Sequence, residues 1–140
     1  MRSPLAKTYF TLVIALAAIM PGQSHSSNDE LPAHFQEAFS SEFCVQEVLE
    51  NAQADFEKCK NAWKAPIEIC AAETGLYEFV TSSELSEEEW AARHEAKAYQ
   101  VTVCLFIVLG KSASDQDNPN RAIYQAIIEY DDTLRELEGR

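Results

Sequence analysis

Four cysteines in a short chain are the feature that most constrains this fold. They are Cys44, Cys59, Cys70 and Cys104, in a chain of 140 residues. An even number of cysteines in a short chain predicts two disulfides if the chain folds in an oxidising compartment. Zinc sites usually pair cysteines two to four residues apart, whereas the closest two here, Cys59 and Cys70, are eleven positions apart. We therefore expect four disulfide-bonded cysteines and no metal.

The first 24 residues indicate that the chain does fold in an oxidising compartment. Arg2 and Lys7 lead into an apolar run from Tyr9 to Met20, which ends at Pro21-Gly22 before small residues follow. A basic start, a short apolar run and a small-residue zone are typical of a secretory signal peptide. The run is shorter than the roughly 20 residues that a bilayer requires, which favours cleavage over anchoring. The sequence thus predicts a signal peptide over residues 1–24, secretion, and no membrane attachment after cleavage.

The composition excludes some classes of partner. The chain has 23 acidic and 11 basic residues, a formal net charge of −12, and loss of Arg2 and Lys7 with the leader makes the remainder more acidic. Such a surface repels phosphate backbones and anionic membranes, so we expect no nucleic-acid or membrane partner. Hydrophobic residues make up 46% of the chain, which argues against disorder. We expect a polar lead-in over residues 25–40 and one helical domain over residues 41–140.

Apolar residues at helical spacing predict the first half of this domain. A helix is expected over residues 41–63, and Pro66 then ends it and opens a second helix over residues 65–80. Gly75 is expected to break the second helix by acting as a C-terminal cap. The apolar stripe of the first helix is Val45, Leu49, Ala52, Phe56, Cys59 and Trp63. Three phenylalanines before it also step by four and would allow an earlier start: Phe35, Phe39 and Phe43.

The second half begins with the clearest helix start in the chain. Ser86 and Glu89 form a capping box, and the apolar stripe that follows runs from Trp90 to Gly110, where a C-terminal cap is expected. Nearly every residue from 101 to 109 is apolar, which is typical of a helix buried on all sides. A last helix is expected from Asn118-Pro119, with its stripe at Ile123, Ile127, Tyr130, Leu134 and Leu137. The predicted fold is all-α, a four-helix bundle-like domain stapled by two disulfides.

The predicted helices constrain how the cysteines pair. On one continuous helix Cys44 and Cys59 would lie about 22 Å apart, too far for a bond. Two pairings then remain open. One joins Cys44 to Cys70 and Cys59 to Cys104, and the other joins Cys59 to Cys70 and Cys44 to Cys104. We prefer the first.

No group of residues matches a catalytic motif. His94-Glu95 lacks the second histidine of a zinc-protease helix, because Ala98 stands at the position where it is required. Since His94 lies on an apolar stripe, we interpret it as a hydrogen-bonded histidine at the edge of the core. With every cysteine bridged, no thiol nucleophile remains. We therefore expect no enzymatic activity, no catalytic residue and no cofactor.

Two functions from different classes remain. The first is protein–protein interaction outside the cell through an exposed helix face, with an extracellular protein as partner. The second is carriage of a small hydrophobic ligand or lipid in the helical core, suggested by the aromatic residues, which make up 10% of the chain. The residues expected to line such a cavity are Phe56, Trp63, Trp90, Val101, Leu105 and Tyr130.

Overall fold

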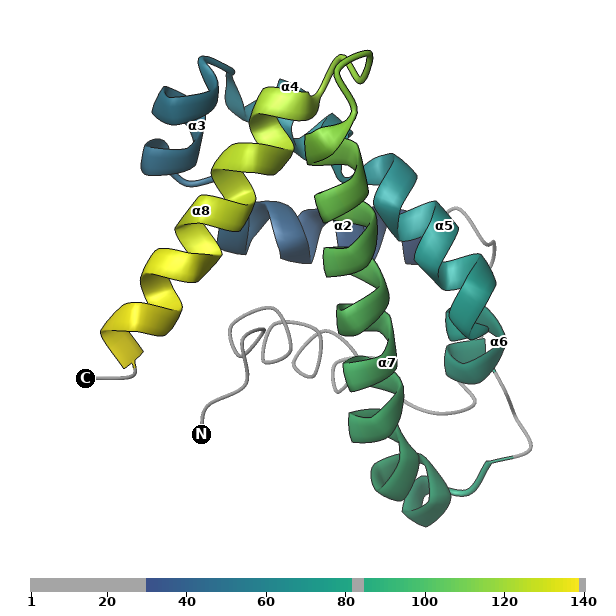
Figure 1. Cartoon of the computed structure of the whole chain (residues 1–140). Helices are drawn as coiled ribbons and strands as arrows, with labels where there is room; N and C mark the ends of the chain where they lie inside the picture. Colours follow the sequence, from purple (N-terminus) through teal and green to yellow (C-terminus); the bar gives the residue numbers. More distant parts are fainter. Residues whose placement is uncertain (1–29, 82–84, 139–140) are drawn as a thin grey trace.

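The computed structural model describes residues 30–81 and 85–138, and every regular element in these ranges is an α-helix (Figure 1). The predicted signal peptide, residues 1–24, lies outside them. The all-α, bundle-like fold with two disulfides is confirmed. The helices are α2 (Glu30–Phe43), α3 (Gln46–Ala52), α4 (Phe56–Ala62), α5 (Lys64–Thr74), α6 (Leu76–Thr81), α7 (Glu87–Ser114) and α8 (Arg121–Glu138).

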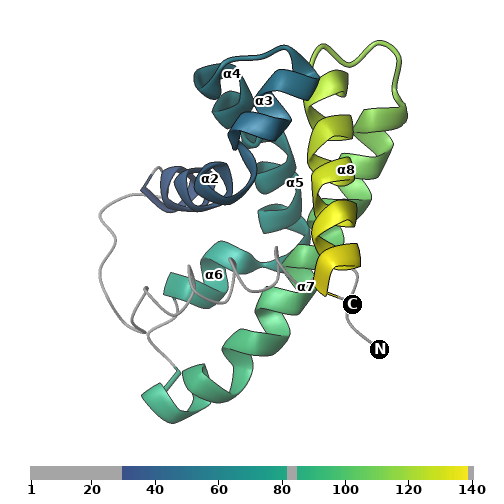
Figure 2. The ribbon, with the colours of Figure 1, turned by 90° about the vertical axis from the view of Figure 1, so that its left-hand side faces the viewer.

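The longest helix, α7, organises the arrangement. In Figure 1 it lies between α5 on one side and α8 on the other, and it packs against both. A 90° turn shows α2, α3 and α4 gathered at one end of the molecule, with α6 beside the N-terminal half of α7 at the other end (Figure 2). The hydrophobic core therefore lies between α7 and the other helices, along the side of α7 that faces them.

The helix predicted over residues 41–63 is wrong, because the chain breaks twice within it. The first break follows α2, where Val45 takes an extended conformation. The second is a reversal at Gln53, which has a left-handed backbone with φ of 54°. The Gln53 N–H donates to the Glu50 carbonyl and the Ala54 N–H to the Leu49 carbonyl, the hydrogen-bond pattern that commonly closes helix C-termini. The next helix, α4, starts at once.

This reversal overturns the predicted disulfide pairing. Cys44 precedes α3 and Cys59 lies in α4, and their Cα atoms are 5.9 Å apart in a disulfide. The second disulfide joins Cys70 of α5 to Cys104 of α7, with Cα atoms 5.7 Å apart. Both pairings left open by the sequence are therefore wrong, since both assumed that Cys44 and Cys59 share one continuous helix. That all four cysteines are bridged is confirmed.

The polar lead-in expected over residues 25–40 is helical from Glu30 onward, as α2. Phe35, Phe39 and Phe43 lie on one face of α2 and are buried, so the early start that their spacing allowed is present. Trp63, at the junction of α4 and α5, stacks on Phe39 with ring centroids 5.1 Å apart and contacts Phe43 at 5.7 Å. These four rings form the aromatic centre of the core.

Polar contacts hold the short helices in place around this centre. The Lys60 ammonium lies 3.0 Å from the Glu37 carboxylate, and this hydrogen-bonded pair raises the pKa of Lys60. Tyr124 of α8 donates its hydroxyl proton to the carbonyl of Ala62, and burial raises the pKa of this phenol. The Tyr77 hydroxyl is different, because it is buried with no hydrogen-bond partner among the described residues. Burial, and to a smaller extent the nearby Glu68 charge, raises the pKa of Tyr77 to about 12.

Gly75 separates α5 from α6 as predicted. Its φ is +67°, a left-handed conformation that costs little for glycine and strains other residues. The nearest atom to an added Cβ would be the Glu78 Oε2 at 3.8 Å, so the surroundings leave room for a methyl group. The requirement for glycine at this position therefore comes from the backbone alone.

Substituting the two described glycines with alanine should have opposite effects. Gly75→Ala should lower the free energy of unfolding by about 1 kcal/mol, because alanine resists the left-handed conformation. Gly110→Ala is the matched control, since Gly110 lies within α7 with no atom near an added Cβ. It should raise the free energy of unfolding by about 0.5–1 kcal/mol. Urea unfolding followed by circular dichroism measures both free energies of unfolding. A Gly75→Ala variant as stable as wild type would show that the backbone at position 75 does not require glycine.

The bounds of α7 and α8 differ partly from the prediction. The α7 helix starts as expected, with the Ser86 Oγ accepting a hydrogen bond from the Glu89 N–H at 3.1 Å. Gly110 does not cap it, because the helix continues to Ser114. The last helix starts at Arg121, two residues beyond the predicted proline. Arg121 and Gln125 of α8 both donate to the Ala113 carbonyl, at 3.1 and 3.0 Å, which fixes the turn between the two helices.

Candidate functional site

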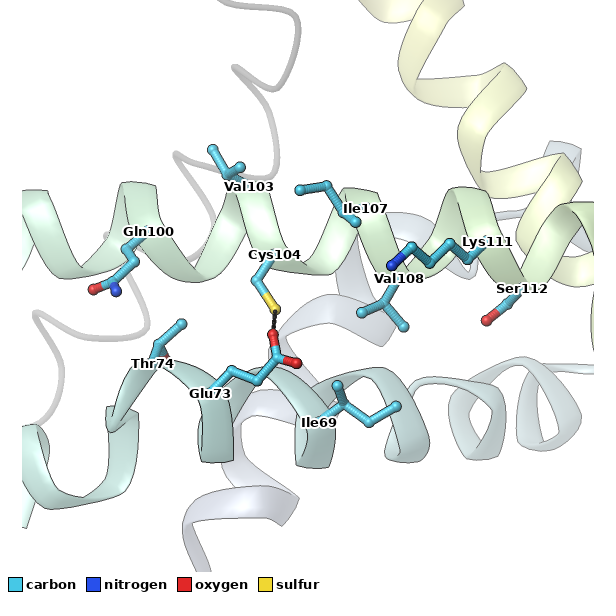
Figure 3. A pocket seen from close by; sticks show the side chains of 10 residues that line it. All are labelled: Ile69, Glu73, Thr74, Gln100, Val103, Cys104, Ile107, Val108, Lys111 and Ser112. Carbon is cyan, nitrogen blue, oxygen red and sulfur yellow. Dashed lines mark hydrogen bonds between the residues drawn. The ribbon is translucent and has the colours of Figure 1, made fainter.

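A groove of about 510 Å³ lies between α5 and α7. Figure 3 shows the side chains of both helices along it, with Cys104 of α7 pointing across toward Glu73 of α5. The Cys104 Sγ lies 3.5 Å from the Glu73 Oε2. The lining residues are Ile69, Glu73, Thr74, Gln100, Val103, Cys104, Ile107, Val108, Lys111 and Ser112.

Two links between α5 and α7 set the width of the groove. The Cys70–Cys104 disulfide joins the helices near the middle. Toward one end, Lys97 of α7 donates from Nζ to the Thr74 carbonyl at 2.5 Å. Thr74 is the last residue of α5, so the lysine places positive charge at the negative end of the helix dipole. The groove is thus formed by covalently joined helices, and both walls are regular secondary structure.

The groove carries little net charge. Its two charged lining residues are Glu73 on α5 and Lys111 on α7, which have opposite signs. Apolar side chains line much of the remainder, and two of them are unusually exposed: Ile69 at 44% and Ile107 at 53%. The chain as a whole has a formal net charge of −12. The nearly neutral and largely apolar groove therefore differs from the average character of the chain.

The side of α7 that faces away from the core is also apolar. Tyr99, Val103 and Ile107 follow each other at four-residue spacing, and Tyr99 is 54% exposed. The outward side of a helix packed on one side normally carries charged residues, yet none occurs on this helix between Lys97 and Lys111. Val103 points away from α5 in Figure 3. We call this strip the outer α7 face and define it as Ala96, Tyr99, Val103, Ile107 and Gly110.

The outer α7 face corrects one sequence prediction. Residues 101–109 were expected to be buried on all sides because almost all of them are apolar. Val101, Leu105 and Leu109 are buried, but Ile107 is not. An apolar run on all sides of a helix is compatible with complete burial and also with an apolar side that is exposed. The spacing of the residues alone did not distinguish these two arrangements.

The residues predicted to line a ligand cavity do not gather at one place. Phe56 is 42% exposed on α4, whereas Trp63 is fully buried against Phe39 and Phe43. Trp90 lies in the first turn of α7 and packs on Phe79. The N-terminal end of α7 lies away from α4 in Figure 1. Val101 and Leu105 are buried in the core, and the ring of Tyr130 contacts Phe43 at 6.3 Å.

The remaining candidate residue is His94. It is half-buried on α7, its ring lies 5.2 Å from that of Trp90, and its Nδ1 lies 2.9 Å from the Ala91 carbonyl oxygen. This is the core-edge position that the sequence predicted. Within residues 30–81 and 85–138, no three histidine, cysteine or acidic side chains are placed to bind a metal ion.

No described helix combines the length and apolar character needed to cross a membrane. The two disulfides are compatible with an extracellular protein. A scan of protein-family models, a search of curated proteins and a search of solved structures each find no match to this chain.

Proposed function

We propose that this chain is a secreted protein that acts by binding another protein through the outer α7 face and the groove beside it. The observation that carries the proposal is the exposure of Ile69, Tyr99 and Ile107 together on a strongly acidic surface. Leaving such a patch in water is unfavourable, and contiguous exposed apolar surface marks interaction sites. The four-residue spacing along α7 suits a partner that also presents a helix.

The rigidity of this surface supports the same proposal. Both walls of the groove are helices joined by Cys70–Cys104 and by the contact of Lys97 with Thr74. A surface that is ordered before binding loses less conformational freedom on association. The carrier hypothesis has weaker support, because Trp63 and Tyr130 are in contact with other core rings.

A photo-reactive amino acid at position 107 tests the proposal. The tagged protein is added to the extracellular fluid of its source and illuminated, and cross-linked products are separated by mass. We expect a discrete adduct from position 107, suppressed by excess unlabelled protein and not by excess of an Ile107→Glu variant. The same label at Leu137 is the matched control, because Leu137 is also an exposed apolar residue, at 61%, and lies on α8.

Two results would contradict the proposal. One is the absence of any adduct from position 107, and the other is equal labelling from positions 107 and 137. Native mass spectrometry of the protein from its own source addresses the alternative. An apolar molecule of a few hundred daltons retained on the protein would favour the carrier hypothesis instead.

A further inference from the structure

We infer that Cys104 is a modification site for small thiols. A thiol that carries no carboxylate opens the Cys70–Cys104 disulfide from the groove and stays attached to Cys104. The modification requires no protein partner, so it goes beyond the proposed function. It is carried by the unequal burial of the four bridged sulfurs, by the groove in front of Cys104 and by the carboxylate beside it.

The four cysteines differ in their access to solvent. Cys59 and Cys70 are fully buried, and Cys44 is 6% exposed. Cys104 is partly exposed, and its side chain points into the groove between α5 and α7 (Figure 3). Thiol–disulfide exchange requires a thiolate to reach one of the two sulfurs, so its rate depends on access. In the folded protein, Cys104 is therefore the cysteine that a dissolved thiol reaches.

The groove has room for a small thiol. Its volume is about 510 Å³, whereas one molecule of liquid water takes up about 30 Å³. Its walls are two helices that the disulfide itself joins, so the space in front of the sulfur is present before any thiol arrives. A small aminothiol can therefore lie beside Cys104 without a rearrangement of the backbone.

Glu73 determines which thiols are favoured. Its Oε2 lies 3.5 Å from the Cys104 Sγ, so an incoming thiolate also approaches a carboxylate. A second negative charge on the thiol increases this repulsion, and an amino group reduces it. The two nearby lysines are less well placed to offset Glu73. Lys97 donates to the Thr74 carbonyl, and Lys111 is seven positions along α7 from Cys104, about 10 Å along the helix axis.

The reaction exchanges one disulfide for another. The sulfur of the small thiolate forms a bond to the Cys104 Sγ, and the bond between the two cysteine sulfurs breaks. Cys70 leaves as a thiolate and takes a proton from water. No oxidant is required, because the small thiol supplies the sulfur of the new disulfide. A free cysteine in a core packs as a small apolar side chain, so the buried position suits the released Cys70 thiol.

Opening this bond removes the covalent link between the two walls of the groove. The contact of Lys97 with Thr74 and the packing of α5 on α7 remain. Cys104 therefore makes the junction between these helices sensitive to small thiols around the protein, whereas the Cys44–Cys59 bond stays closed.

Peptide mapping after exposure to cysteamine tests the inference. The folded protein is incubated with an excess of cysteamine and quenched in acid, and its free thiols are alkylated after unfolding. At early times we expect cysteamine on Cys104, the alkyl group on Cys70 and an intact Cys44–Cys59 bond. The Cys44–Cys59 bond should open at least about tenfold more slowly, because its sulfurs must first be exposed by local unfolding.

A charge variant tests the role of Glu73. Glu73→Gln should raise the rate constant for mercaptoacetate, expressed per thiolate, by about three- to tenfold, and that for cysteamine by less. Glu95→Gln is the matched control. It removes the same charge from an exposed position of α7 that does not line the groove, so both rate constants should change by less than about twofold. Circular dichroism checks that both variants are folded.

Four results would overturn the inference. They are cysteamine on Cys70 instead of Cys104, equal rates of opening for the two disulfides, no adduct on the folded protein, and equal effects of Glu73→Gln and Glu95→Gln on the reaction with mercaptoacetate. The photo-reactive label at position 107 is a separate measurement. If it captured no protein, the proposed function would fail and the thiolation results would be unaffected.

Discussion

Replacing Trp63 with alanine should lower the free energy of unfolding by about 3–5 kcal/mol, the range for removal of a buried tryptophan. Trp63 is fully buried and stacks on Phe39 while contacting Phe43, so its loss leaves a cavity bounded by two rings. Its indole nitrogen has no hydrogen-bond partner among the described residues. The expected loss therefore comes from packing and buried area, without a hydrogen-bond contribution.

Two further variants make this prediction specific. Trp63→Phe keeps an aromatic ring against Phe39 and removes the unpartnered N–H, so it should cost about 1–2 kcal/mol. Phe56→Ala is the matched control, because Phe56 lies at the opposite end of α4 from Trp63 and is 42% exposed; it should cost less than about 1 kcal/mol. Urea unfolding followed by circular dichroism measures all three. Equal costs for Trp63→Ala and Phe56→Ala would show that the aromatic centre is not placed as described.

Removing the Cys70–Cys104 disulfide as Cys70→Ala with Cys104→Ala should lower the free energy of unfolding by about 4 kcal/mol. The bond closes a loop with a sequence separation of 34 residues, and the entropy that a disulfide removes from the unfolded chain grows with loop length. The bond is also the covalent link between α5 and α7, so its loss leaves Lys97 and Thr74 as the polar connection between these helices.

The other disulfide supplies the comparison. Cys44–Cys59 closes a separation of 15 residues, so removing it as a pair of alanines should cost about 3 kcal/mol. Both double variants are measured by urea unfolding under the same conditions, after peptide mapping of the wild type has confirmed the two pairs. A larger loss from the Cys44–Cys59 pair would mean that native-state contacts outweigh loop entropy here.

Local signals in the sequence predicted much of the fold. Ser86 with Glu89 marks the start of α7, and Gly75 marks the end of α5, because each acts within one helical turn. The spacing of Phe35, Phe39 and Phe43 allowed α2, although the composition before it suggested a polar lead-in. In the same way, the count and spacing of the cysteines were sufficient to predict that all four are bridged.

The reversal at Gln53 had no comparable signal. Glutamine is not a residue that favours the left-handed conformation, and the apolar stripe from Val45 to Trp63 continues across the break in helical steps. One hint was present, since Asp55 followed by Glu57 resembles a helix N-terminus. Asp55 does cap α4, accepting a hydrogen bond from the Lys58 N–H at 2.8 Å. A stripe that crosses several short helices imitates one long helix, and only the folded chain separates them.

The sequence by itself determined the helical class, the bridged cysteines, the acidic composition and the caps at Ser86 and Gly75. These properties depend on composition or on residues within one or two turns of each other. The tertiary structure decided that Cys44 pairs with Cys59 and that Ile107 is exposed while Leu105 is buried. Both depend on where segments far apart in the chain come to lie: α4 folds back toward Cys44, and α5 and α8 cover two sides of α7, whereas Ile107 on another side is 53% exposed.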